Sequence, residues 1–206
     1  ALPISFHYFQ NLLTLYCSRN QLSSIDLSTA TQLTHFQCGN NLIQSLDLTG
    51  LNALILLVCD HNFLTDLDLS DQSNLGYLNC AHNLLTTLDC SNHGQLVLLY
   101  CFNNALTSLY IKNGAIEQDT WFGGNPNLAY ICADSSQLAS VSALALQNGN
   151  AGCVVDDSCV LSTQGFAVSS NNVLYPNPVA DILNIGSKTP IESIHIHNLL
   201  GQVVLS

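Results

Sequence analysis

The chain has 206 residues, a formal net charge of −11 and only three basic residues, Arg19, Lys112 and Lys188. So few cations argue against binding to a nucleic-acid backbone or to an anionic membrane surface. Charged residues make up 8% of the chain, against roughly a quarter in ordinary domains, whereas 48% are hydrophobic, enough for a continuous core. No apolar run approaches the roughly 18 residues of a membrane span, and no signal peptide is visible at the start.

The first residues already belong to a repeating pattern. Ile4, Ser5 and Phe6 precede Ile25, Asp26 and Leu27 by 21 residues, and the two triplets hold related residue types. We therefore expect the chain to begin in the closing half of an earlier coil, with processing or truncation having removed what preceded it.

From about residue 12 to 111 the unit L-x-x-L-x-C-x-x-N-x-L-x-x-L-D-L recurs every 21 residues. Only a fixed structural period keeps one side chain in phase over so many intervals, and this unit is typical of leucine-rich repeats, with Cys at the third strand position. The residues expected to form structural ladders are the five cysteines and the five asparagines that follow each of them by three positions: Cys17, Cys38, Cys59, Cys80, Cys101, Asn20, Asn41, Asn62, Asn83 and Asn104.

The alternation within each unit predicts the fold. Leu, Leu and Cys alternate with polar or variable residues, as in a short strand with one buried face. One strand per coil gives a parallel sheet on the concave face of a solenoid. A second triplet, such as Leu46-Asp47-Leu48, should close the core from the other side. The predicted class is therefore mainly β, with 21-residue repeats and little or no helix.

The ladder residues are expected to be structural. Each Asn amide stands where the chain leaves a strand, so it can satisfy backbone groups that the turn leaves unpaired. The in-register cysteines point inward with a geometry awkward for disulfides, which favours free, buried thiols that act as small hydrophobes. Cys90 replaces a core Leu and should behave likewise.

The repeat degrades after residue 114, and we predict a domain order of repeats (1–114), degenerate repeat and cap (115–160), linker (161–172) and a further domain (173–206). Asn125 and Phe122 still fall in the Asn and Cys phases, but from Leu128 a different segment begins. A cap must cover the open core of the last repeat. A cap disulfide could join Cys132 to Cys159, or to Cys153. A zinc site made by these three is the weaker alternative, because their spacing lacks a C-x-x-C knuckle.

Residues 173–206 alternate apolar and polar residues around Pro and Gly turns, which predicts a small antiparallel β domain. The segment also resembles the N-terminal part of the C-terminal sorting domain of the type IX secretion system of Bacteroidota. The resemblance implies a secreted or outer-membrane surface protein that the type IX machinery handles. Its motif residues are Tyr175, Pro176, Asn177, Pro178, Asp181 and Gly201.

Two columns of polar residues have alternative interpretations. His61 and His82 are one repeat apart and should stack; with a third ligand they could bind a metal, but exposed turn residues are the simpler interpretation, here as for His35 and His93. The Asp column that includes Asp47 and Asp68 could hold Ca²⁺, although a solvated acidic stripe is favoured. No hydrolase, zinc-protease or phosphate-loop motif occurs. We therefore predict no enzyme activity and no cofactor.

The outward-facing residues of the L-x-x-L-x-C strands, here called the strand face, are the candidate binding site. This surface turns apolar and aromatic from the third repeat onward, and large apolar patches with aromatic anchors usually mark contact surfaces. A neighbouring domain of the same polypeptide could instead cover it. The predicted binding residues are Tyr16, His35, Ile55, Leu56, Val58, Tyr77, Asn79, Val97, Leu98, Tyr100, Phe102 and Trp121.

These features predict a secreted or cell-surface protein-binding module, acting in adhesion or in docking within a surface complex. The alternative is a glycan-binding module, or an accessory to a surface carbohydrate-utilisation or enzyme system, with Tyr16, Tyr77, Tyr100 and Trp121 stacking on sugar rings. Protein binding is favoured because the patch is rich in Ile, Leu and Val rather than in polar donors.

Overall fold

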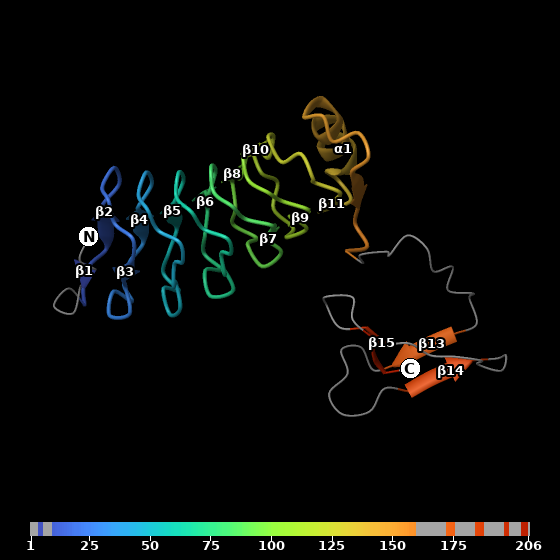
Figure 1. Cartoon of the computed structure of the whole chain (residues 1–206), viewed down its shortest axis with the longest axis horizontal. Helices are drawn as coiled ribbons and strands as arrows, with labels where there is room; N and C mark the ends of the chain where they lie inside the picture. Colours follow the sequence, from blue (N-terminus) through green and yellow to red (C-terminus); the bar gives the residue numbers. More distant parts are fainter. Residues whose placement is uncertain are drawn as a thin grey trace. The chain divides into compact units, whose positions relative to one another are not determined.

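The computed structural model describes residues 10–159 in full and, for the backbone alone, five short strands in the remaining parts of the chain. Contacts divide the chain into two compact units, Ala1–Leu161 and Ser162–Ser206. The first unit is a solenoid whose coils stack side by side (Figure 1). The predicted fold class, a mainly β solenoid with parallel strands and 21-residue repeats, is confirmed.

The larger sheet of the solenoid has six parallel strands, one from each L-x-x-L-x-C stretch. Its register steps by 21 residues, so that Leu15, Phe36 and Leu57 are direct neighbours. The central residue of each strand from β4 to β8 is buried and its two neighbours are half-buried, which is the expected alternation. The strands, from one edge to the other, are β2 (Thr14–Tyr16), β4 (His35–Gln37), β5 (Leu56–Val58), β6 (Tyr77–Asn79), β8 (Leu98–Tyr100) and β10 (Asp119–Trp121).

A second, four-stranded parallel sheet closes the core, as the second apolar triplets predicted. It consists of β7 (Thr87–Asp89), β9 (Ser108–Tyr110), β11 (Tyr130–Cys132) and β12 (Val154–Asp156). In the earlier coils this side has less regular structure, apart from β1 (Ile4–Ser5), which pairs with β3 (Ile25–Asp26). That pairing follows the predicted 21-residue step between Ile4 and Ile25.

The asparagine ladder satisfies the backbone inside the turns. Asn62 donates from Nδ2 to the carbonyls of Cys38 and Cys59 at 3.0 and 3.1 Å, and its Oδ1 accepts from the Ile43 N–H at 3.0 Å. Asn41, Asn83, Asn104 and Asn125 make the same set of bonds one repeat apart. Each buried amide therefore ties one coil to the next.

The cysteine ladder lies in the core. Cys38, Cys59, Cys80 and Cys101 are fully buried and carry free thiols, as does Cys90. Burial raises the pKa of every one of these thiols, to about 12 for Cys101. At the N-terminal end of the ladder, Cys17 is at the edge of burial, and its pKa rises to about 11 for the same reason. The thiols are thus small apolar side chains that fix the register.

The end of the solenoid differs from the sequence prediction in two ways. The segment at Leu128 is not a departure from the repeat, because β11 continues the second sheet with Ile131 opposite Leu109, after a step of 22 instead of 21 residues. The Ser/Ala-rich stretch that follows forms helix α1 (Leu138–Gln147), which was not predicted. This helix occupies the place of the next strand of the larger sheet.

The second unit contains two antiparallel strand pairs, β13 (Asn172–Tyr175) with β14 (Asn184–Ser187), and β15 (Ile196–His197) with β16 (Val203–Leu205). Antiparallel pairing matches the prediction for this segment. The domain boundaries at 114, 160 and 172 stay predictions.

Candidate functional site

The strand face becomes progressively more apolar along the solenoid. In the first two repeats it presents Thr14, His35 and Gln37, whereas later repeats present Leu56, Val58 and Leu98 at the same positions. Large exposed side chains border it: Tyr16 is 62% exposed, Trp121 57% and Ile55 46%. Val97 is also exposed, and the remaining predicted face residues are half-buried. Such partly covered apolar side chains can bury more of their area against a partner.

Aromatic rings form a continuous row at the C-terminal half of the strand face. Tyr77 packs edge-on against Tyr100 at a centroid distance of 5.8 Å, and Tyr100 packs edge-on against Trp121 at 6.0 Å. Trp121 in turn contacts Phe102 at 6.1 Å. These arrangements are those that ring quadrupoles favour, so the structure brings four of the predicted residues into one cluster.

The row continues into the turn that borders the face. Phe102 packs edge-on against His82 at 5.1 Å, and His82 stacks on His61 at 4.0 Å, as predicted for that pair. Both histidines have positive φ, 51° and 54°, in a column of left-handed turn residues that ends at Gly124. The membership of His61 and His82 in the aromatic row was missed, although the one-repeat step from Phe102 to the Cys-adjacent turn positions could have indicated it.

Asp119 holds the aromatic row in place. Its Oδ1 accepts from Trp121 Nε1 at 2.6 Å, and its Oδ2 accepts from the Tyr100 hydroxyl at 3.1 Å. Partial desolvation, together with Asp119, raises the pKa of Tyr100, because the phenolate would lie beside a carboxylate. The indole and the phenol are therefore fixed before any partner arrives.

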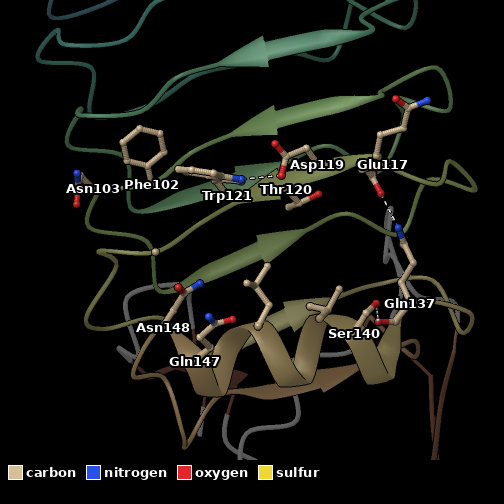
Figure 2. A pocket seen from close by; sticks show the side chains of 14 residues that line it. Phe102, Asn103, Glu117, Asp119, Thr120, Trp121, Gln137, Ser140, Gln147 and Asn148 are labelled. Carbon is tan, nitrogen blue, oxygen red and sulfur yellow. Dashed lines mark hydrogen bonds between the residues drawn. The ribbon is translucent and has the colours of Figure 1, made fainter.

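A groove of about 660 Å³ opens beside this cluster, between β10 and helix α1 (Figure 2). Trp121, Phe102 and Thr120 line one side, and Val141 and Leu144 of α1 line the other. Glu117 accepts from Gln137 Nε2 at 2.6 Å at one end of the groove. Side-chain amides and a hydroxyl complete the lining: Asn103, Gln118, Gln137, Ser140, Gln147 and Asn148. The sequence gave no sign of this groove, because its far wall is the unpredicted helix.

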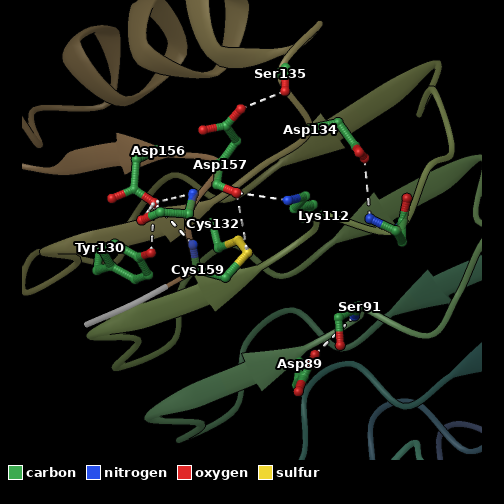
Figure 3. Close-up of a disulfide and its surroundings, with 12 residues drawn as sticks. Asp89, Ser91, Lys112, Tyr130, Cys132, Asp134, Ser135, Asp156, Asp157 and Cys159 are labelled. Atoms are coloured by element: carbon green, nitrogen blue, oxygen red, sulfur yellow. Dashed lines mark hydrogen bonds between the residues drawn. A yellow bond between two sulfur atoms is a disulfide. The ribbon is translucent and has the colours of Figure 1, made fainter. Parts of the chain in front are cut away.

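The cap behind the groove is tied to the last coil. Cys132 and Cys159, the pair considered first from the sequence, form a disulfide with their Cα atoms 5.1 Å apart (Figure 3). Cys153 is free and half-buried. Nearby, Lys112 donates to the Asp157 carbonyl at 2.7 Å, and the Tyr130 hydroxyl donates to Asp156 at 2.8 Å.

The Asp column has a local structural role. Asp47 Oδ1 accepts from the Thr49 N–H at 3.0 Å, and Asp68 Oδ1 accepts from the Ser70 N–H at 2.9 Å, as in an Asx turn. These hydrogen bonds lower the pKa of both carboxyl groups. Asp26 and Asp89 bond the N–H two residues on in the same way. The column thus shapes the turns after each second triplet.

His93 departs from the interpretation of the histidines as exposed turn residues. Its side chain is buried, at the position that Gln72 occupies one repeat earlier. Desolvation lowers its pKa. Within the described part of the chain, no group of three or more His, Cys, Asp or Glu residues is arranged to hold a metal ion.

The sorting-motif residues other than Tyr175, namely Pro176, Asn177, Pro178, Asp181 and Gly201, lie outside the described residues, and Tyr175 is the last residue of β13. In the parts of the chain that the structure describes, no helix has the length and apolar character needed to cross a membrane.

Comparisons with known proteins support two parts of the chain separately. Residues 173–206 match the family described as the secretion system C-terminal sorting domain. No curated protein matches the chain. Among solved structures, a leucine-rich-repeat protein of Leptospira interrogans is 22% identical with a TM-score of 0.50, covering 71% of this chain and 37% of that one.

A second solved structure is the functional domain of InlJ from Listeria monocytogenes, described as including a cysteine ladder. It is 29% identical with a TM-score of 0.48, covering 66% of this chain and 32% of that one. The chain thus spans about a third of the length of the solved chains it matches. By fold the chain is a leucine-rich-repeat solenoid, and its match to a sorting domain at 173–206 indicates a secreted or cell-surface protein.

Proposed function

We propose that the chain is a protein-binding module that acts in adhesion, or in docking within a surface complex, through its strand face. The observation that carries this proposal is the fixed aromatic row on an apolar, partly exposed sheet. Aromatic anchors held rigid before binding lose little conformational entropy in a complex, which favours affinity. No catalytic role is proposed.

The electrostatics of the face indicate the character of the partner. Asp60 and Asp119 lie on or beside the aromatic row, and Asp60 contributes to the raised pKa of Tyr77. None of the predicted strand-face residues is Lys or Arg. An apolar partner surface with a basic rim would complement this charge and associate faster at low salt.

The sorting-domain match supports the proposed location. We propose secretion through a type IX system in a member of the Bacteroidota, with the solenoid displayed at the outer-membrane surface or released. The secretion machinery would then be a second partner, one that binds the C-terminal unit and leaves the strand face free.

Binding through the strand face can be tested with a triple variant, Leu56→Ser, Leu98→Ser and Tyr100→Ser. A matched control removes comparable apolar area from another exposed column, Leu42→Ser, Phe63→Ser and Leu84→Ser, whose residues are 46–50% exposed. Both proteins would be immobilised and exposed to the extracellular and surface fraction of the natural community of the source cell.

The strand-face variant is expected to lose the saturable partner that the wild type retains, while the control keeps it. The proposal fails if the control loses the partner and the strand-face variant binds like the wild type. Circular dichroism of both variants distinguishes lost binding from lost folding.

The glycan alternative is favoured by one specific observation. Trp121 is an exposed ring flanked by Asn103, Gln118 and Asp119 in the groove, a combination of stacking surface and polar groups suited to neutral sugars. A titration with neutral oligosaccharides, followed by the fluorescence of Trp121, tests it directly because the chain contains a single tryptophan.

A further inference from the structure

The groove exposes the open edge of a sheet. β10 is the last strand of the six-stranded sheet, and in the described part of the chain its only strand neighbour is β8. In the regular repeats the next coil supplies another strand at this position. Here helix α1 stands in its place, and a helix cannot continue the ladder of backbone hydrogen bonds.

The backbone groups of Thr120 point into the groove. Asp119 donates its N–H to the Val97 carbonyl at 3.5 Å, and the Trp121 carbonyl accepts from the Cys101 N–H at 2.8 Å, so both residues bond towards β8. In a parallel sheet the residue between them directs its N–H and C=O to the opposite side. Thr120 lines the groove, so its two backbone groups meet that space.

Helix α1 fences this edge without filling it. At one end Gln137 bonds Glu117, and at the other the Asn148 side chain lies so close to Gly123 that a Cβ there would stand 3.1 Å from Asn148 Oδ1. Between these two contacts the groove separates helix from strand, as Figure 2 shows. The opening therefore runs along the strand edge, which is the shape that an extended chain needs.

The charge of the groove further narrows the occupant. Glu117 and Asp119 both accept hydrogen bonds, but only from neutral donors, so their negative charges stay uncompensated. No Lys, Arg or His is among the described residues that line the groove. A neutral sugar would leave both the charges and the strand edge unmatched.

We propose that the groove binds an extended, basic peptide segment of a partner protein, which adds a strand to β10. Main-chain bonds to Thr120 supply affinity, alternate side chains contact Trp121 and Leu144, and a Lys or Arg faces the two carboxylates. The inference rests on the proposed function as a protein binder, but it concerns a different surface from the apolar strand face.

The test uses one matched pair of variants. Thr120→Pro removes the N–H that faces the groove, and the pairing with β8 does not use that N–H. Thr120→Val keeps the N–H and removes only the hydroxyl. Ser140→Phe, at an exposed position on α1, fills the groove without touching β10 and serves if Thr120→Pro does not fold.

The probes are ten-residue peptides selected from a random displayed library on the full chain, with binding followed by the fluorescence of Trp121. We expect enriched peptides to alternate apolar and polar residues around a Lys or Arg. Their affinity should fall at least tenfold for Thr120→Pro and for Ser140→Phe, and less than twofold for Thr120→Val.

Three results would overturn strand addition: no enrichment, enriched peptides that bind Thr120→Pro like the wild type, or a Trp121 response to neutral oligosaccharides alone. A natural partner that needs Leu56, Leu98 and Tyr100 but not the Thr120 N–H would remove this inference and leave the proposed function standing.

Discussion

The regular repeats and the cap satisfy their backbones in different ways. In the repeats, each buried Asn bonds both its own coil and the preceding one, so every turn resembles the next. In the cap the period breaks, a disulfide and a helix take over, and the edge of β10 is left open. The difference teaches that the repetitive part provides a rigid platform, whereas the irregular end provides a groove with its own chemistry.

The largest effect is expected from breaking the ladder in the middle of the repeats. Asn62→Ala leaves the Ile43 N–H and the carbonyls of Cys38 and Cys59 without their partner in a buried turn. Because each buried unsatisfied group costs roughly 1–3 kcal/mol, the free energy of unfolding should fall by about 3–5 kcal/mol. Urea denaturation followed by circular dichroism measures this loss.

Asn20→Ala is the matched control for that experiment. Asn20 is exposed at the start of the ladder and bonds only carbonyls of its own turn. The same substitution there should cost less than about 1 kcal/mol. Equal losses at the two positions would contradict the account of the ladder as a link between coils.

The cap should depend on its disulfide. The bond closes a loop with a sequence separation of 27, and replacing Cys132 and Cys159 together by Ser should destabilise the cap by about 3 kcal/mol. Hydrogen exchange in α1 should then rise more than exchange in β4 to β6. Cys153→Ser, at the free half-buried cysteine of the same cap, should leave both unchanged; a uniform rise along the solenoid would be the contrary result.

Thiol reactivity separates the two regions by burial. Cys153 is half-buried, whereas the ladder thiols are buried and have raised pKa values, so little of their reactive thiolate exists at pH 8. Ellman's reagent should modify one thiol per native chain within minutes, and none in Cys153→Ser. Rapid modification of several thiols in the folded protein would refute a closed core.

The smallest effect concerns the Asp column. Hydrogen bonds lower the pKa of Asp47 and Asp68, so their contribution to stability is present above about pH 4 and is lost as the pH falls through the lowered values. Replacing both by Asn keeps an acceptor for the turn but removes the titration. The melting temperature of that variant should decline less between pH 5 and pH 2 than that of the wild type, and parallel curves would argue against this role.

The sequence predicted the periodic part of the fold well because one residue type marks each phase. Phe122 and Asn125 continued the phases of Cys101 and Asn104 and occupy the expected buried positions. The groove could not be predicted in this way. One extra residue before Ile131 shifts the register of β11, and α1 has weak amphipathic character, with only Val141 and Ala145 fully buried.

Side-chain roles were harder to predict than positions. The period placed Tyr77, Tyr100 and Trp121 on one face, but it could not show that Asp119 fixes two of the rings. It also could not separate His93, which is buried, from His82, which joins the aromatic row. These distinctions depend on contacts between coils, which a single repeat does not encode.

Site-specific photo-crosslinking tests the central claim, that partners meet the strand face, most directly. A photoreactive phenylalanine analogue would replace Leu98 on the face in one protein and Phe63 in the exposed control column in another. The account predicts a discrete crosslinked partner from position 98 and none from position 63. A partner captured from position 63 alone, or from neither position while the chain still binds its partner, would contradict it.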